Sequence, residues 1–269
     1  MESGPRGRTE GDMRPALVGV AAVLAVLAIL VLACNGGPGE TSQPTSGTPT
    51  PVLNRDPCTP APPSVEPTSN VFVNPRLEEG RDPWFVVTPP EFLISNEIKN
   101  SGEASAQLQM AEPAEAVGTK VFYLVQEMAP TEFPEVISGA YLVDSWLRGT
   151  NIQFVQLVVI AFGASNLPMG YPNHQIAYIL SGIESEPFEI LNAQFVFLNS
   201  NDPDPREPAI GEWREFEVKV KRDFGVLWGA VPEGYQCLRV LFEVRYDNKG
   251  PGAPAEADVY FDDLYFGPG

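Results

Sequence analysis

Residues 238–246 have the sequence Leu-Arg-Val-Leu-Phe-Glu-Val-Arg-Tyr, in which a large apolar side chain occupies every second position. Successive side chains of a β-strand point to opposite faces, so these apolar side chains share one face. The other face carries Arg239, Leu241, Glu243 and Arg245. This alternation is typical of a half-buried antiparallel strand with its polar face toward solvent.

The same period of two recurs from residue 70 to the end of the chain. Residues 215–221 alternate in the same way, with Phe216, Val218 and Val220 on one face. Further strand candidates are 84–87, 105–110, 120–126, 140–147, 153–162, 175–180, 189–198 and 259–266. Turn-rich breaks separate them, and no long helical period appears between them. The pattern predicts an all-β domain over residues 70–269, a single antiparallel jelly-roll β-sandwich.

Composition excludes several classes of function. The 269 residues include 17 Lys and Arg against 35 Asp and Glu, a formal net charge of −18. Nucleic-acid binding is not expected, because neutralising phosphates requires clustered basic residues. His174 is the only histidine. A single histidine argues against multi-histidine metal sites and His-based catalytic triads.

The first 34 residues have the order of an export signal. Arg6, Arg8 and Arg14 precede an uncharged apolar run over residues 16–34. The run ends in Val-Leu-Ala-Cys at residues 31–34, which resembles the bacterial lipoprotein cleavage box. In that family the cysteine thiol carries lipid and the chain is cut just before it. The resemblance therefore implies lipidation at Cys34.

An uncleaved transmembrane helix is the alternative reading of this segment. Nineteen residues at about 1.5 Å each span roughly 28 Å, close to a bilayer core of about 30 Å. Because the arginines precede the apolar run, both readings place the rest of the chain outside the cytoplasmic membrane. We therefore expect a membrane-anchored, extracytoplasmic protein at the cell surface.

Residues 35–69 read as a tether. They contain nine prolines and ten Ser or Thr residues, with few large apolar side chains. Such a segment buries too little surface to offset its ordering entropy, so we expect a disordered, partly extended linker. If Cys34 carries lipid, Cys58 and Cys237 remain. In an exported protein they can form a disulfide that pins the tether to the domain, or stay as free thiols.

Four landmarks along the domain resemble one family. They are Asn74 to Gly80 followed by Trp84, Asn100-Ser101-Gly102, Gly211-Glu212-Trp213, and Val259 to Leu264. In this order they resemble the CenC-type carbohydrate-binding modules of the galactose-binding-like jelly-roll superfamily. Leu77 replaces the usual Phe, and residues 163–174 and 184–208 make the middle longer. The resemblance implies that residues near 75 and near 262 lie at adjoining strands.

The same resemblance implies a structural calcium ion. The positions that match the family's site are Glu78, Ser101, Gly102, and Asp262 or Asp263. Two carboxylates with backbone carbonyls would supply the oxygen ligands that this cation prefers. The alternative is a surface carboxylate pair without metal.

Sugar binding requires exposed aromatic rings flanked by polar groups. Candidate ligand-binding residues outside the obvious core positions are Tyr171, His174, Tyr178, Trp228 and Tyr235. Core or loop packing is the alternative role for each. The sequence contains no Gly-x-Ser-x-Gly or His-Glu-x-x-His motif, and no carboxylate pair stands out, so we expect no catalysis.

The prediction is a non-catalytic cell-surface lipoprotein that binds extracellular polysaccharide. The first rival is an envelope protein with a structural or protein-binding role and no sugar ligand. The second is a glycan-active enzyme.

Overall fold

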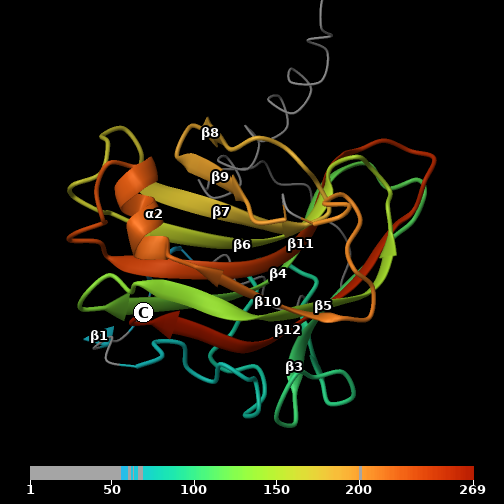
Figure 1. Ribbon diagram of the computed structural model, residues 1–269, viewed down its shortest axis with the longest axis horizontal. Helices are drawn as coiled ribbons and strands as arrows, with labels where there is room; N and C mark the ends of the chain where they lie inside the picture. The colour runs from blue at the N-terminus through green and yellow to red at the C-terminus, as the bar shows by residue number, and fades with distance from the viewer. Residues whose placement is uncertain (1–55, 60–61, 63, 66–68, 200–201) are drawn as a thin grey trace, which may run out of the picture. The chain divides into compact units, whose positions relative to one another are not determined.

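The computed structural model describes residues 56–59, 62, 64–65, 69–199 and 202–269 (Figure 1). Two sheets form a β-sandwich, which confirms the predicted fold class. Seven strands form one sheet in the order β1-β4-β11-β6-β7-β9-β8, and five form the other in the order β10-β5-β12-β3-β2. The elements are β1 Ser64–Val65, β2 Leu93–Ser95, β3 Ser105–Glu112, β4 Gly118–Pro130, β5 Val136–Leu147, β6 Gln153–Phe162, β7 Asn173–Ser181, β8 Phe188–Ile190, β9 Ala193–Phe197, β10 Trp213–Val218, α2 Val220–Leu227, β11 Cys237–Lys249 and β12 Ala255–Gly267.

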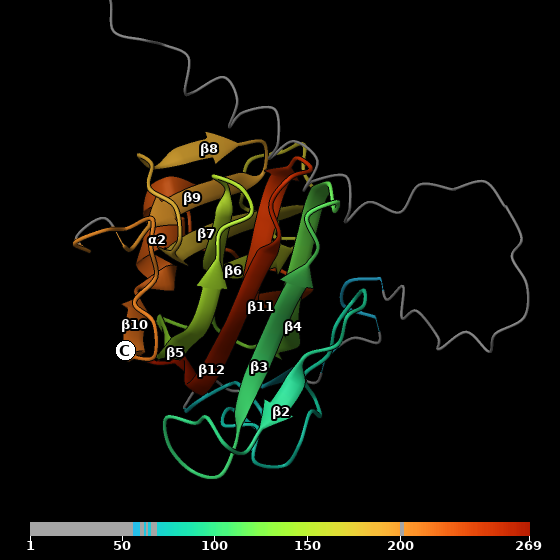
Figure 2. The same ribbon diagram turned by 90° about the vertical axis from the view of Figure 1, so that its right-hand side faces the viewer.

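The long strands pair in antiparallel fashion. β11 lies between β4 and β6, and β12 lies between β5 and β3, as Figure 2 shows for β12. Two pairs run parallel, β1 with β4 and β7 with β9. β10 pairs only with β5, so it forms one edge of the five-stranded sheet.

The core lies between the sheets and is centred on Phe242 of β11. Its ring lies 5.2 Å from the ring of Phe261 and 6.1 Å from those of Phe72 and Phe216, measured between centroids. The alternation of apolar side chains on β11 and β12 places these rings on the inner faces. Pairs of aromatic rings at this spacing contribute stability in addition to that gained from the apolar area that they bury.

The two ends of the domain meet, as predicted. The backbone N–H of Val71 donates to the carbonyl of Phe266 at 2.7 Å, and that of Leu264 donates to Pro75 at 3.1 Å. The side chain of Asn70 bridges the same segments, because it donates to the Leu264 carbonyl and accepts from the Phe266 N–H. These contacts close the sandwich.

The polar face of β11 is buried, whereas the sequence predicted that it faces solvent. Arg239 and Glu243 are each 4% exposed and Arg245 is 0% exposed. Charges at such positions need partners, because burial without compensation is costly. Arg239 pairs with Glu127 at 2.6 Å, and Arg245 pairs with Asp247.

Three predicted strands differ in the structure. Residues 189–198 contain parts of two strands, β8 and β9, where the sequence predicted one. β10 ends at Val218, and α2 begins at Val220, where the sequence predicted strand to residue 221. The helix brings the Phe224 ring to 5.1 Å from Phe133. Residues 84–87 form only an isolated bridge between Phe85 and Val125, where the sequence predicted a strand.

The predicted anchor lies outside the described residues, since these exclude residues 1–55 and with them Cys34. Among the residues that are described, no helix has the length and apolar character needed to span a bilayer.

Candidate functional site

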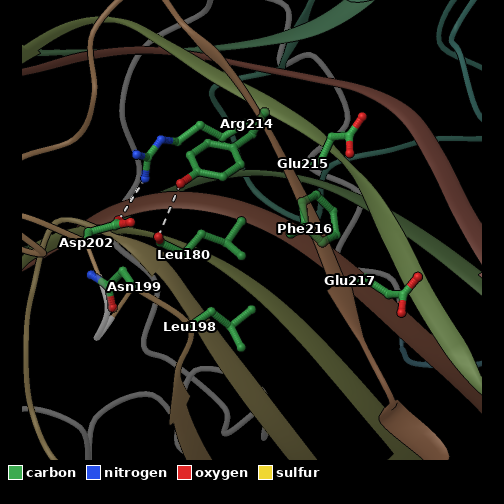
Figure 3. Close-up of a pocket in the computed structure, with 9 residues that line it drawn as sticks. Leu180, Leu198, Asn199, Asp202, Arg214, Glu215, Phe216 and Glu217 are labelled. Atoms are coloured by element: carbon green, nitrogen blue, oxygen red, sulfur yellow. Dashed lines mark hydrogen bonds and ion pairs between the residues drawn. The ribbon is translucent and has the colours of Figure 1, made fainter.

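A cleft of about 440 Å³ runs along the free edge of β10 (Figure 3). We call it the edge cleft. One wall comes from β10 and β5 of the five-stranded sheet, and the other comes from β7 and the chain that follows β9. Its lining residues are Tyr141, Leu180, Leu198, Asn199, Asp202, Arg214, Glu215, Phe216 and Glu217.

A second cleft of about 460 Å³ adjoins it on the outer face of the same sheet. We call it the sheet cleft. It shares Glu215, Phe216 and Glu217 with the edge cleft. The remaining lining residues are Asn100, Ser138, Gly139, Ala140 and Asp263. The two clefts therefore have this segment of the edge strand as a common wall, and together we call them the path.

Alternation along β10 determines which group faces which cleft. Arg214 and Phe216 point inward, whereas Glu215 and Glu217 point outward. Figure 3 shows Arg214 directed toward Asp202, with the two glutamates on the other side of the strand. Gly139 lies opposite Phe216, and a Cβ there would come within 3.0 Å of the Phe216 ring. The small residue at this position lets the ring pack under the strand.

An ion pair fixes the polar end of the edge cleft. Arg214 Nη1 donates to Asp202 Oδ2 at 2.8 Å, and the two side chains are 33% and 26% exposed. The hydrogen bond to Asp202 raises the pKa of Arg214. Tyr141 donates from its hydroxyl to the Leu180 carbonyl at 3.2 Å, and burial raises the pKa of Tyr141. The edge cleft thus presents a charged pair beside a buried aromatic ring.

The residues predicted for calcium come together in space. Asp262 is fully buried, and its Oδ2 accepts from the N–H groups of Asn100 and Ser101 at 2.8 and 3.0 Å. Asp263 accepts from Ser101 Oγ at 2.6 Å. Glu78 accepts from the N–H of Glu103 at 2.8 Å, beside Gly102.

These contacts do not suit calcium as they stand. The carboxylates accept hydrogen bonds from N–H and O–H donors, and the Arg76 guanidinium lies 3.0 Å from Asp263. A calcium ion requires six to eight oxygens converging on one point. In the described part of the chain, no group of three or more His, Cys, Asp or Glu residues is arranged to hold a metal ion. Calcium stays a prediction of the family resemblance.

The aromatic residues predicted to bind sugar lie mostly inside the domain. Tyr178 is fully buried, and Trp228 and His174 are 8% and 2% exposed. Tyr178 donates to Asp223 of α2, and Trp228 donates to the Gln175 carbonyl. Burial leaves these three rings no surface on which a sugar can stack.

Tyr171, His174 and Trp228 form an edge-to-face aromatic cluster at the start of β7. The ring of His174 lies 4.8 Å from that of Trp228 and 6.1 Å from that of Tyr171. Burial lowers the pKa of His174. Tyr171 is 39% exposed. Tyr235 lies apart, donates to the Pro130 carbonyl at 2.7 Å, and has a pKa raised to about 12 by burial.

Cys58 and Cys237 form a disulfide with a Cα–Cα distance of 5.8 Å. Next to it, the Cys58 N–H donates to Glu127 Oε1 at 3.2 Å. Because Glu127 also pairs with Arg239, the disulfide and the buried ion pair form one assembly at the end of β11.

Sequence reasoning missed most of the residues that line the two clefts, although Asp263 of the sheet cleft was among those predicted for calcium. One signal was available in β10, where Arg214 falls on the same face as Phe216 and Val218. A cation on an apolar face needs a partner, and Asp202 in the loop that precedes β10 supplies it.

No protein-family model and no curated protein matches this chain. Solved structures match at low identity. TmCBM61 in complex with beta-1,4-galactotriose has 12% identity and a TM-score of 0.34, over 73% of this chain and 97% of that one. The cellulose-specific carbohydrate-binding module CBM28 has 14% identity and a TM-score of 0.37, over 76% and 99%. The beta-1,2-glucanase from Parabacteroides distasonis has 14% identity and a TM-score of 0.35, over 70% and 22%.

Proposed function

We propose that this chain is a non-catalytic carbohydrate-binding protein, and that its ligand lies in the edge cleft and the sheet cleft. We further propose that lipid on Cys34 holds it at the cell surface, outside the cytoplasmic membrane, where it meets extracellular polysaccharide. The alternative anchor is an uncleaved helix over residues 16–34.

The single observation that carries the binding proposal is that the two clefts share one wall. They share the segment from Glu215 to Glu217, so an extended ligand can pass from one to the other. Each has a volume within the range of about 300–1,000 Å³ usual for small-ligand sites. A chain of sugar rings suits a path of this form better than one compact ligand does.

The groups along the path suit a ligand rich in hydroxyl groups. Carboxylates accept from hydroxyls, and the outer donors of Arg214 can donate to them. Phe216 and Tyr141 are buried beneath the clefts, so the polar groups would make the contacts with the ligand. The net charge of −18 opposes anionic ligands such as nucleic acid.

The carboxylates of the clefts are poorly placed for hydrolysis. A glycosidase holds its acid and its second carboxylate on either side of the scissile bond. Glu215 and Glu217 point the same way from one strand, and Glu217 pairs with Lys219 at 2.7 Å. Asp202, on the other side, pairs with Arg214. We therefore propose binding without catalysis.

The tether and the disulfide are consistent with export. A disulfide persists in an oxidising compartment, outside the cytoplasm. The Cys58–Cys237 bridge fastens the end of the tether to β11. Replacing Cys34 with Ala is expected to abolish acyl labelling in cells, whereas labelling that persists would contradict lipidation at Cys34.

The binding proposal is tested by retention of the full-length chain, in detergent, on immobilised cell-wall and plant polysaccharides. Ser138→Trp places a large ring in the sheet cleft and is expected to abolish retention. The matched control is Ser145→Trp, an exposed position on β5 outside both clefts. Retention on no polysaccharide, or equal loss in both variants, would overturn the proposal and favour a protein-binding or structural role.

A further inference from the structure

Glu215 is the exposed carboxylate at the wall that both clefts share. It lies in the middle of β10, and alternation directs its side chain outward into the sheet cleft. In Figure 3 its carboxylate points away from Arg214. A ligand that passes between the clefts must pass this group.

The other carboxylates of the clefts already have cationic partners. Asp202 pairs with Arg214 at 2.8 Å, Glu217 with Lys219 at 2.7 Å, and Asp263 with Arg76 at 3.0 Å. Glu215 has neither an ion pair nor a side-chain hydrogen bond within the described ranges. It is therefore the one carboxylate of the path whose charge is left for a ligand.

A second group in the path also lacks a partner. Asn199 is 2% exposed and lines the edge cleft. Its Nδ2 donates to the carbonyls of Ile183 and Pro205 at 2.9 and 2.6 Å. Its Oδ1 is buried and accepts no hydrogen bond from the residues that are described. Buried polar atoms are almost always satisfied, so this atom indicates a missing donor.

Both open groups are acceptors, and Glu215 is the exposed one, so a ligand group that pairs with it must supply donors. A metal ion does not fit the requirement, because no metal-holding group of carboxylates occurs in the part of the chain that the structure describes. A primary ammonium group supplies three N–H donors together with a positive charge. The chain's net charge of −18 attracts such a ligand and repels a uronic acid or a sulfated sugar.

We propose that the glycan bound by this protein carries free amino groups, and that one of them pairs with Glu215 in the sheet cleft. The ligand class is a polymer of amino sugars that are not N-acetylated. This inference rests on the proposed carbohydrate binding and narrows it to one chemistry.

The test compares three ligands of equal length: a glucosamine tetramer, its fully N-acetylated form and a glucose tetramer. Each is titrated against the full-length chain at low and at high salt. We expect the glucosamine tetramer to bind about fivefold tighter than the others at low salt, the upper end of an exposed ion pair. Salt is expected to reduce this preference, because it screens exposed charges.

Glu215→Gln is expected to remove the preference, so that the glucosamine tetramer binds no tighter than the other two tetramers. The matched control is Glu212→Gln, which changes the same charge at an exposed position outside both clefts. It is expected to keep the preference.

The outcomes separate this inference from the proposed function. Equal binding of all three ligands, or a preference that survives in Glu215→Gln, overturns the amino-sugar assignment and leaves carbohydrate binding intact. Binding of none of them, together with no retention on any polysaccharide, overturns both.

Discussion

The Glu78 carboxylate fills the space that a side chain at Gly102 would need. A Cβ built on Gly102 would lie 1.8 Å from Glu78 Oε1. The same carboxylate accepts from the backbone N–H of Glu103 at 2.8 Å. This contact joins the opening turn of the domain to the turn before β3, next to the carboxylates of β12. Three segments that are distant in the sequence therefore meet here, and they can do so because Gly102 has no side chain.

Gly102→Ala is expected to destabilise the domain by about 2–4 kcal/mol. Part of the loss is the left-handed backbone at φ +60°, which costs a non-glycine residue about 1–2 kcal/mol. The rest is the displacement of Glu78 from its hydrogen bond, about 1–2 kcal/mol. Urea unfolding of the full-length chain measures the sum.

Gly118→Ala is the control for backbone strain alone. Gly118 has φ +90°, and a Cβ there would meet nothing within 4 Å. We expect it to cost about 1–2 kcal/mol. Equal losses in the two variants would show that the Glu78 contact contributes nothing.

The sequence predicted those parts of the fold that local periodicity determines. The alternation over residues 238–246 predicts the strand that the structure shows as β11. The family landmarks along the domain correctly placed Asp262 close to Ser101, whose N–H donates to it together with that of Asn100. The alternation of apolar and polar residues cannot show where a strand ends if the following residue would be buried both in a strand and in a helix. Val220 is such a residue, so the start of α2 was not predicted.

Apart from Arg214 on the apolar face of β10 and Asp263, local patterns could not predict the residues of the candidate site. The edge cleft lies between the segment that follows β9 and strand β10. Asp202 of that segment forms an ion pair with Arg214 of β10. Aromatic residues gave a misleading signal, because an aromatic-rich sandwich uses most rings for its core. Tyr178 sits at an inward position of β7, which the alternation of that strand already implied.

Loss of the Cys58–Cys237 disulfide is expected to lower the free energy of unfolding by about 4 kcal/mol. The bridge closes a loop with a sequence separation of 179 residues, and a long loop constrains the unfolded chain strongly. Cys58→Ala should show the loss in thermal unfolding without reductant. Cys34→Ala, which leaves the bridge intact, is the control. A Cys58→Ala domain as stable as the control would contradict the expectation.

Calcium is tested by thermal unfolding with and without a chelator. Because N–H donors already occupy the Asp262 carboxylate, we expect EDTA to leave the melting temperature unchanged. Asp262→Ala is expected to lower it with or without the chelator, since two backbone N–H groups lose their acceptor. A rise in melting temperature on adding calcium would contradict this and support the calcium ion implied by the family resemblance.

Glu243 is expected to make stability fall as pH rises. Burial raises the pKa of Glu243 above its usual value of 4.5, although Arg245 and the hydrogen bond from Gln156 oppose the shift. Asp247 adds to the rise, and Tyr123 lies directly opposite on β4. The folded chain therefore holds this proton at a pH where the unfolded chain has lost it.

The sign follows from proton linkage. The folded state binds more protons than the unfolded state between pH 4.5 and the raised pKa of Glu243, so the free energy of unfolding falls across that window. Because only one proton is involved, the free energy of unfolding falls by at most about 1.4 kcal/mol per pH unit. Below pH 4.5 this contribution is fully present.

Glu243→Gln isolates the effect from other titrating groups such as His174. The variant keeps the shape of the side chain but has no proton to lose. We expect it to match the native chain at low pH and to be the more stable of the two at neutral pH. Urea unfolding at a series of pH values measures the difference. Parallel curves for the two proteins would show that Glu243 titrates in the folded state as it does in the unfolded chain.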